Sequence, residues 1–123
     1  FLYVKKPNKK EKELGLEKFT KKPAGSYLGN VDSKNANTIS GDPSRKIIPR
    51  ANTHPTVKPI ELMSYLVILG SRKDDIVLDP FLGSGTTAIS CVLNYRKYVG
   101  IEVDKDYYTI SESRIKYWKP KFF

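Results

Sequence analysis

The chain has 123 residues, enough for one ordinary domain or part of a larger one, and it can bury a core without disulfides or metals. Lys and Arg number 22 against 13 Asp and Glu, and the resulting net charge of +9 favours polyanionic partners such as nucleic acid. The single cysteine, Cys91, excludes an internal disulfide and a thiolate metal cluster, so we expect a reducing compartment and no metal site. No apolar run reaches the length of about 18 residues that a membrane span needs. The apolar start at residues 1–4 is also too short for a signal peptide, and we expect a soluble, cytoplasmic protein.

The N-terminal part divides into two segments. Residues 1–20 predict a short strand over 1–4 followed by a basic connector, which is a loop or a solvated helix start. Because the chain begins with Phe rather than Met and opens in an apolar segment, we expect a fragment or a processed chain. Residues 21–52 are polar and rich in Gly, Ser, Asn, Pro and Lys, and this composition predicts a long loop or mobile insertion.

Residues 53–123 predict an α/β unit. Pro59 is suited to the first position of a helix over residues 60–69, whose apolar residues recur at helical spacing (Leu62, Met63, Leu66 and Val67). A strand is predicted over 76–78, a helix over 86–95 with Cys91 as a small core residue, and a second strand over 98–101. Asp104 is a suitable N-cap for a last helix, whose predicted inner face holds Tyr107, Ile110, Ser111, Ile115 and Trp118. The order strand, helix, strand, helix is half of a parallel α/β sheet.

A glycine-rich corner connects the first of these strands to the helix behind it. Gly83 and Gly85 allow a sharp turn and a close approach of ligand to backbone. Residues 83–88 fit the dinucleotide pattern G-x-G-x-x-A, and Glu102 ends the next strand where an acid would hold ribose hydroxyls, so NAD is one possible ligand. No lysine follows the second glycine, which excludes a phosphate-binding P-loop. A tight turn without any ligand explains such an isolated pattern roughly half the time.

Two neighbouring features favour a cationic ligand over NAD. Asp79, at the end of the strand, would repel a pyrophosphate and attract an ammonium or sulfonium, which favours S-adenosylmethionine. Upstream, the segment His54–Pro59 places the hydroxyl of Thr56 and the ammonium of Lys58 at a helix entry, where a ligand carboxylate is favoured. Taken alone, this segment is better explained as a proline-braced turn with an exposed lysine.

Three segments together carry a family resemblance: His54-Pro-Thr-Val-Lys-Pro59, Leu78-Asp-Pro-Phe-Leu-Gly-Ser-Gly-Thr-Thr87 and Val99-Gly-Ile-Glu-Val-Asp104. They resemble the site-specific DNA methyltransferases that modify adenine N6 or cytosine N4, in the permuted order in which the cofactor half comes last. The resemblance covers residues 53 to about 118, and more weakly residues 3–6 and 11–16. It implies the C-terminal half of a Rossmann-like methyltransferase fold, S-adenosylmethionine as cofactor, and methylation of double-stranded DNA in restriction-modification, with adenine N6 favoured.

The resemblance also implies roles for single residues. Asp79 would face the α-amino group of S-adenosylmethionine, Glu102 would accept hydrogen bonds from its ribose, and Phe81 and Val103 would flank its sulfonium and adenine. Thr56 and Lys58 would close the carboxylate side. The expected cofactor-binding residues are His54, Thr56, Lys58, Asp79, Phe81, Gly83, Ser84, Gly85, Thr86, Glu102 and Val103.

One family motif is missing. These enzymes hold the target base with a tetrad of the form Asp/Asn/Ser-Pro-Pro-Tyr/Phe, and Asp42-Pro43-Ser44 lacks both the second proline and the aromatic residue. We therefore expect no catalytic residue in this chain, and we expect an N-terminal segment or a separate chain to carry the tetrad.

DNA contact is predicted from the basic N-terminal run. Lys5, Lys6, Lys9 and Lys10 would contact phosphates and make binding salt-dependent, although a solvated basic face explains them equally well. Residues 21–52 lie where the family carries target-recognition elements, and a solvated loop is again an equal alternative. Two other functions stay open: an NAD-binding oxidoreductase fragment, and a nucleic-acid-binding module without catalysis.

Overall fold

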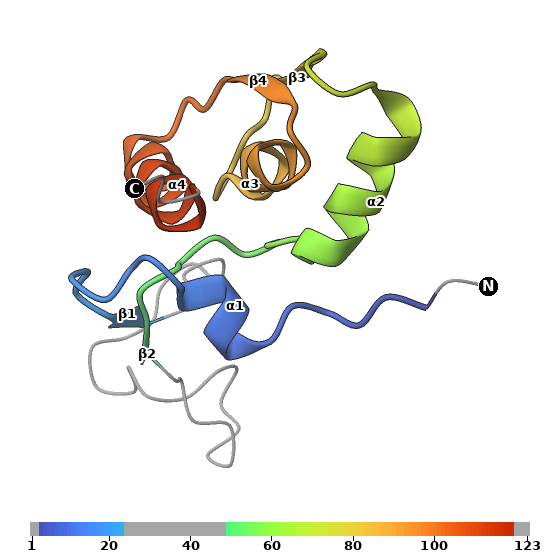
Figure 1. The fold of residues 1–123 in the computed structure, drawn as a ribbon. Helices are drawn as coiled ribbons and strands as arrows, with labels where there is room; N and C mark the ends of the chain where they lie inside the picture. The colour runs from blue at the N-terminus through green and yellow to red at the C-terminus, as the bar shows by residue number, and fades with distance from the viewer. Residues whose placement is uncertain (1–2, 24–48, 120–123) are drawn as a thin grey trace, which may run out of the picture.

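The computed structural model describes residues 3–23 and 49–119. Its elements in chain order are α1 (Lys9–Glu13), β1 (Lys22–Pro23), β2 (Pro49–Arg50), α2 (Ile60–Gly70), β3 (Ile76–Asp79), α3 (Thr86–Leu93), β4 (Lys97–Gly100) and α4 (Lys105–Trp118). Figure 1 shows α3 between α2 and α4, with α1 and the β1–β2 pair to one side of this group. Over the described ranges, none of the helices combines the length and the apolar character that crossing a bilayer requires.

Strands β3 and β4 are parallel neighbours, with Ile76 opposite Lys97 and Asp79 opposite Gly100. Helix α3 connects them, so the predicted strand–helix–strand unit is confirmed. The predicted boundaries were slightly off. Helix α3 ends at Leu93 rather than at residue 95, because Asn94 leaves the helical conformation and Tyr95 has a positive φ of 60°.

Side-chain capping fixes the starts of α4 and α2, locally in α4 and across the sequence in α2. The Asp104 carboxylate accepts a hydrogen bond from the Tyr107 N–H at 3.0 Å, which confirms Asp104 as the N-cap of α4. Pro59 is the N-cap of α2 and not its first residue, and it forms no side-chain capping bond. The Ile60 N–H instead donates to Oε1 of Glu11 at 2.8 Å. A side chain from α1 therefore performs the capping that Pro59 does not.

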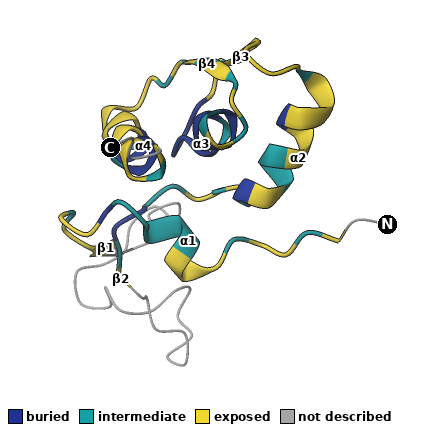
Figure 2. Cartoon of the chain, viewed as in Figure 1, coloured by how far each residue is buried: buried dark blue, intermediate teal, exposed yellow. Residues whose placement is uncertain are grey.

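Two clusters of buried apolar side chains form the core. The larger joins α2, α3 and α4 and contains Ile60, Leu82, Ala88, Ile89 and Ile115. Figure 2 shows the buried residues gathered on α3 and on the sides of α2 and α4 that face it. Cys91 is fully buried in α3, as predicted. The smaller cluster contains Leu16, Ala51 and Ile110. It packs the segments that follow α1 and β2 against α4.

The N-terminal part differs from the prediction in one respect. Tyr3 and Val4 belong to no strand, because no described strand lies beside them to pair with, and residues 1–2 lie outside the described residues. The connector behind them contains α1, which is capped by the side chain of Asn8. Of the predicted loop over 21–52, residues 24–48 lie outside the described residues. Its two ends pair as β1 and β2, with Lys22 opposite Arg50.

Apolar side chains remain exposed on one side of the sheet and on α2. Ile76, Leu78 and Val99 project from the same face of β3 and β4, and all are at least half exposed. In α2 only Ile60 and Val67 are buried, although Leu66 shares the predicted apolar spacing. The exposed residues among these, together with Leu69, form what we call the uncovered apolar face: Leu66, Leu69, Ile76, Leu78 and Val99.

Candidate functional site

The corner between β3 and α3 is tied to the chain that leaves β4. The Leu82 N–H donates to the Ile101 carbonyl at 2.8 Å, and the Ile101 N–H donates to the Asp79 carbonyl at 2.9 Å. Gly83 and Gly85 have φ values of 56° and 81°, in the left-handed region that favours glycine. The backbone thus makes the sharp turn that the two glycines predicted.

Glu102 reaches this corner. Its Oε2 accepts a hydrogen bond from the Gly83 N–H at 2.7 Å, and its Oε1 accepts one from the Asp104 N–H at 2.9 Å. The end of β4 and the turn after β3 are therefore joined through one carboxylate. Because a carboxylate offers about four acceptor positions, two of them remain for a ligand.

His54 packs against the same corner. A Cβ built on Gly83 would lie 2.6 Å from Nε2 of His54, so only glycine fits beneath the ring. Nδ1 of His54 accepts a hydrogen bond from the Thr56 N–H at 3.3 Å, which leaves Nε2 as the protonated nitrogen of the neutral ring. Burial lowers the pKa of His54, and the nearby Glu102 carboxylate opposes this shift. At neutral pH the ring is therefore uncharged.

Asn52 and Glu11 position the segment that carries His54. Asn52 is buried, its Nδ2 donates to the Lys12 carbonyl at 2.9 Å, and its Oδ1 accepts from the His54 N–H at 3.1 Å. At the other end of the segment, Glu11 holds the Ile60 N–H. Sequence reasoning missed both residues. The contact from Asn52 to Lys12 and the contact from Glu11 to Ile60 span 40 and 49 positions, and only the contact from Asn52 to His54 is local.

Arg114 holds the corner from the side of α4. It is fully buried, and its Nη1 donates to the Ser84 carbonyl at 2.5 Å, to Ser84 Oγ at 2.9 Å and to Thr86 Oγ1 at 3.4 Å. Burial lowers its pKa to about 10, and Glu11 partly opposes that shift. The predicted inner face of this helix did not include Arg114, although Arg114 follows Ile110 by about one helical turn.

The remaining predicted residues lie around this corner with little contact to the core. Oδ1 of Asp79 accepts from the Phe81 N–H at 3.0 Å, which fixes the carboxylate at the start of the turn. Phe81 and Val103 are 88% and 96% exposed. Thr56 and Lys58 are also exposed, and the Lys58 ammonium donates to the Thr56 carbonyl at 3.3 Å.

The structure thus brings His54, Gly83 and Glu102 into direct contact and places Ser84 and Thr86 against Arg114. The predicted DNA-contacting lysines are exposed: Lys5, Lys6, Lys9 and Lys10. Across the part of the chain that the structure describes, no group of three His, Cys, Asp or Glu side chains is placed to hold a metal ion.

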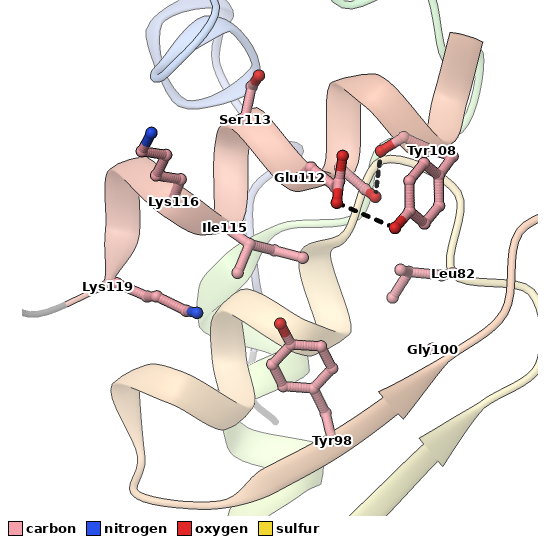
Figure 3. A pocket seen from close by; sticks show the side chains of 10 residues that line it. Leu82, Tyr98, Gly100, Tyr108, Glu112, Ser113, Ile115, Lys116 and Lys119 are labelled. Atoms are coloured by element: carbon pink, nitrogen blue, oxygen red, sulfur yellow. Dashed lines mark hydrogen bonds between the residues drawn. The ribbon is translucent and has the colours of Figure 1, made fainter. Parts of the chain in front are cut away.

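A pocket of about 700 Å³ lies between α4 and β4 (Figure 3). Leu82, Tyr98 and Ile115 give it an apolar lining, and Lys116 and Lys119 stand beside them on α4 and just after it. Tyr108 also lines it and donates a hydrogen bond to Glu112 at 2.9 Å. None of the predicted cofactor-binding residues lines this pocket, although Leu82, which belongs to the corner, does.

The family model described as DNA methylase, of the N6/N4 methyltransferase type, matches residues 2–113. The Type II methyltransferase M2.MboI of Moraxella bovis is 48% identical over 61 residues, covering 50% of this chain and 22% of its own length. The DNA adenine methyltransferase YhdJ of Escherichia coli K12 is 37% identical over 71 residues, covering 58% of this chain and 24% of its own length. The chain therefore spans about a quarter of the length of these relatives.

The structure of TTHA0409 from Thermus thermophilus, complexed with S-adenosyl-L-methionine, superposes with a TM-score of 0.50 at 38% identity. The match covers 52% of this chain and 26% of that one. The predicted fold class, part of an α/β methyltransferase fold with a parallel sheet and flanking helices, is confirmed by this likeness and by the β3–α3–β4 unit.

Proposed function

The chain belongs to the N6/N4 DNA methylase family, and from this premise we propose that it is the cofactor-binding C-terminal part of a DNA methyltransferase. S-adenosylmethionine is the methyl donor of this family. The acceptor that we propose is the exocyclic amino group of adenine or cytosine in double-stranded DNA. Adenine N6 is favoured, because the relative YhdJ is named a DNA adenine methyltransferase.

One observation carries the proposal: segments from three separate parts of the sequence meet at one glycine. The Gly83 N–H donates to Glu102, and the ring of His54 covers the Cα of Gly83. These are the three segments on which the family resemblance rests. A turn that served only to connect β3 to α3 would need neither contact.

The chemistry of this corner fits a ligand that carries an ammonium, a ribose and an apolar ring. Asp79 would bind the ammonium, and the free acceptor positions of Glu102 would bind ribose hydroxyls. Phe81 and Val103 are apolar side chains left almost wholly exposed, and a bound sulfonium and adenine would cover them. Lys58 would turn from the Thr56 carbonyl to a ligand carboxylate, since its present hydrogen bond is exposed and long.

When bound, the cofactor supplies a methyl group that its sulfonium charge activates toward an amino nitrogen. The residues of this chain contribute binding and orientation, which are the principal contributions when the cofactor carries the reactive group. Asp79 and Glu102 fix the two ends of the ligand, and the packed corner prevents it from sliding along the strand ends. No residue of this chain is proposed to contact the target base.

The base contacts would come from a tetrad in another polypeptide segment, N-terminal to this one or on a separate chain. The uncovered apolar face supports this partner: Ile76 is 67% exposed and Leu69 is 71% exposed. A two-stranded sheet with one bare apolar face is marginally stable alone. We propose that the tetrad-bearing segment covers that face. The exposed lysines of the N-terminal run would contact DNA phosphates.

The proposal is tested by calorimetric titration of S-adenosylmethionine into the intact protein that contains this chain. Asp79→Ala should weaken binding at least tenfold, about 1.4 kcal/mol, because it removes the partner of the ammonium. Asp75→Ala is the matched control, since Asp75 makes a similar turn hydrogen bond, to the Arg72 N–H at 2.8 Å, just before β3. Equal effects of the two substitutions would contradict the proposed site. Binding of NAD in place of S-adenosylmethionine would favour the oxidoreductase, and a DNA gel shift indifferent to cofactor and to Asp79→Ala would favour the non-catalytic module.

A further inference from the structure

We propose that Arg114 is a positioning residue that holds the glycine corner in its ligand-binding shape through Ser84. The inference rests on the proposed function, because it concerns the affinity of the same corner for S-adenosylmethionine. It adds a residue that none of the three resembling segments contains.

The first argument is the geometry of the turn. Ser84 lies between two glycines that both have positive φ, and glycines are the least restrained residues in a backbone. Ser84 is the one residue between them with a side chain that the protein can hold. Arg114 binds both its carbonyl and its hydroxyl through Nη1, so both oxygens point into the protein. Arg114 thereby fixes the conformation of the turn between the two glycines.

The second argument is the environment of the guanidinium. Arg114 is fully buried, yet no carboxylate lies within ion-pair distance of it, since the described residues contain only the pair Lys22–Asp106. Its Nε and Nη2 are buried without a hydrogen-bond partner. The nearby charge of Glu11 only partly opposes the desolvation penalty of this buried guanidinium, a penalty that an apolar side chain at the same place would avoid. Stability alone therefore gives no reason for an arginine at this position, and the hold on Ser84 does.

The third argument is that the corner is held from opposite sides. Glu102 binds the Gly83 N–H, and Arg114 binds the next residue, Ser84, from α4. Gly85, the residue after that, approaches α4 so closely that a Cβ would lie 3.0 Å from Cβ of Ser111. Three consecutive residues are thus fixed, each by a different contact. Loss of the Arg114 contact would free the middle one.

The experiment measures S-adenosylmethionine affinity and thermal unfolding of the same variants, in the intact protein that contains this chain. Arg114→Met should raise the Kd at least tenfold, and Arg114→Lys should give an intermediate value, because lysine keeps the charge and loses the planar donor group. Ser84→Ala should raise the Kd less, and adding it to Arg114→Met should have little further effect.

The matched control is Arg96→Met. Arg96 also donates to main-chain carbonyls, those of Asn94 and Ser71 at 2.6 and 2.7 Å, but away from the corner. It should lower the unfolding temperature and leave the Kd unchanged. A wild-type Kd in folded Arg114→Met would overturn the proposal. If that variant does not fold, wild-type Kd values in both Arg114→Lys and Ser84→Ala would overturn it. Failure of the unsubstituted protein to bind S-adenosylmethionine would instead reject the proposed function.

Discussion

Gly85 offers a direct test of how tightly the corner packs on α4. The substitution is Gly85→Ala, which adds a single methyl group. Gly85 has a φ of 81°, and the added Cβ would lie 3.0 Å from Cβ and 3.2 Å from Cα of Ser111. A third contact, to Cδ1 of Ile115, would be 3.3 Å. Two of the three atoms are the Cα and Cβ of one helical residue, so relief requires α4 to move.

Two costs add in this variant. A non-glycine residue in the left-handed region costs about 1–2 kcal/mol. Overpacking a core by one methyl group costs about 1–3 kcal/mol when the backbone has to shift. We therefore expect Gly85→Ala to lower the free energy of unfolding by about 2–5 kcal/mol, a large part of the roughly 5–15 kcal/mol that holds a domain together.

The assay is urea unfolding of the intact protein that contains this chain, followed by far-ultraviolet circular dichroism. Gly70→Ala is the matched control, because Gly70 lies in α2 with nothing within 4 Å of the added Cβ. Removing a helical glycine should raise the free energy of unfolding by about 0.5–1 kcal/mol. A loss in Gly85→Ala below about 1 kcal/mol, or a change equal to that in Gly70→Ala, would refute the packing argument.

Three further predictions concern the segment that carries His54. Glu11→Ala should lower the free energy of unfolding by about 1 kcal/mol in the same urea assay, because it uncaps α2. Glu11→Gln keeps the acceptor oxygen and should retain the stability. The control is Glu61→Ala, which changes an exposed residue and should have no effect. Asn52→Ala leaves two part-buried backbone groups, the Lys12 carbonyl and the His54 N–H, without this partner and should cost about 2–3 kcal/mol by thermal unfolding. A loss of under 1 kcal/mol would contradict this role. The pKa of His54, the only histidine, lies below its usual 6.5, so the unfolded chain takes up a proton first as pH falls. Its contribution to stability is complete above pH 6.5 and declines below it, and a proton NMR titration with a midpoint at or above 6.5 would disprove this.

The parts of the fold that depend on neighbouring residues were predictable from the sequence. The apolar run at 76–78, the positive-φ glycines and the Asp104 cap all act within one turn of chain, and the structure has each of them. The sequence predicted the extent of helix α2, but it did not predict which of its apolar residues are buried. The helix is apolar on most sides, so spacing alone does not show that Leu66 stays exposed while Val67 is buried.

The supporting residues of the corner were not predictable in the same way. Glu11 contacts Ile60, and the Asn52 amide nitrogen contacts Lys12, across long stretches of sequence, so only the folded chain brings these groups together. Arg114 was left out of the predicted inner face of α4, because a charged residue is rarely fully buried. Sequence patterns therefore predict contacts between neighbouring residues better than contacts across long stretches of the chain.

The cap that Glu11 places on α2 also has a consequence for how the chain folds. It closes a loop of sequence between residues 11 and 60, and contacts of such separation form late, after local helices and turns. Shortening the sequence between β1 and β2 would therefore speed folding while every residue of the corner stayed the same.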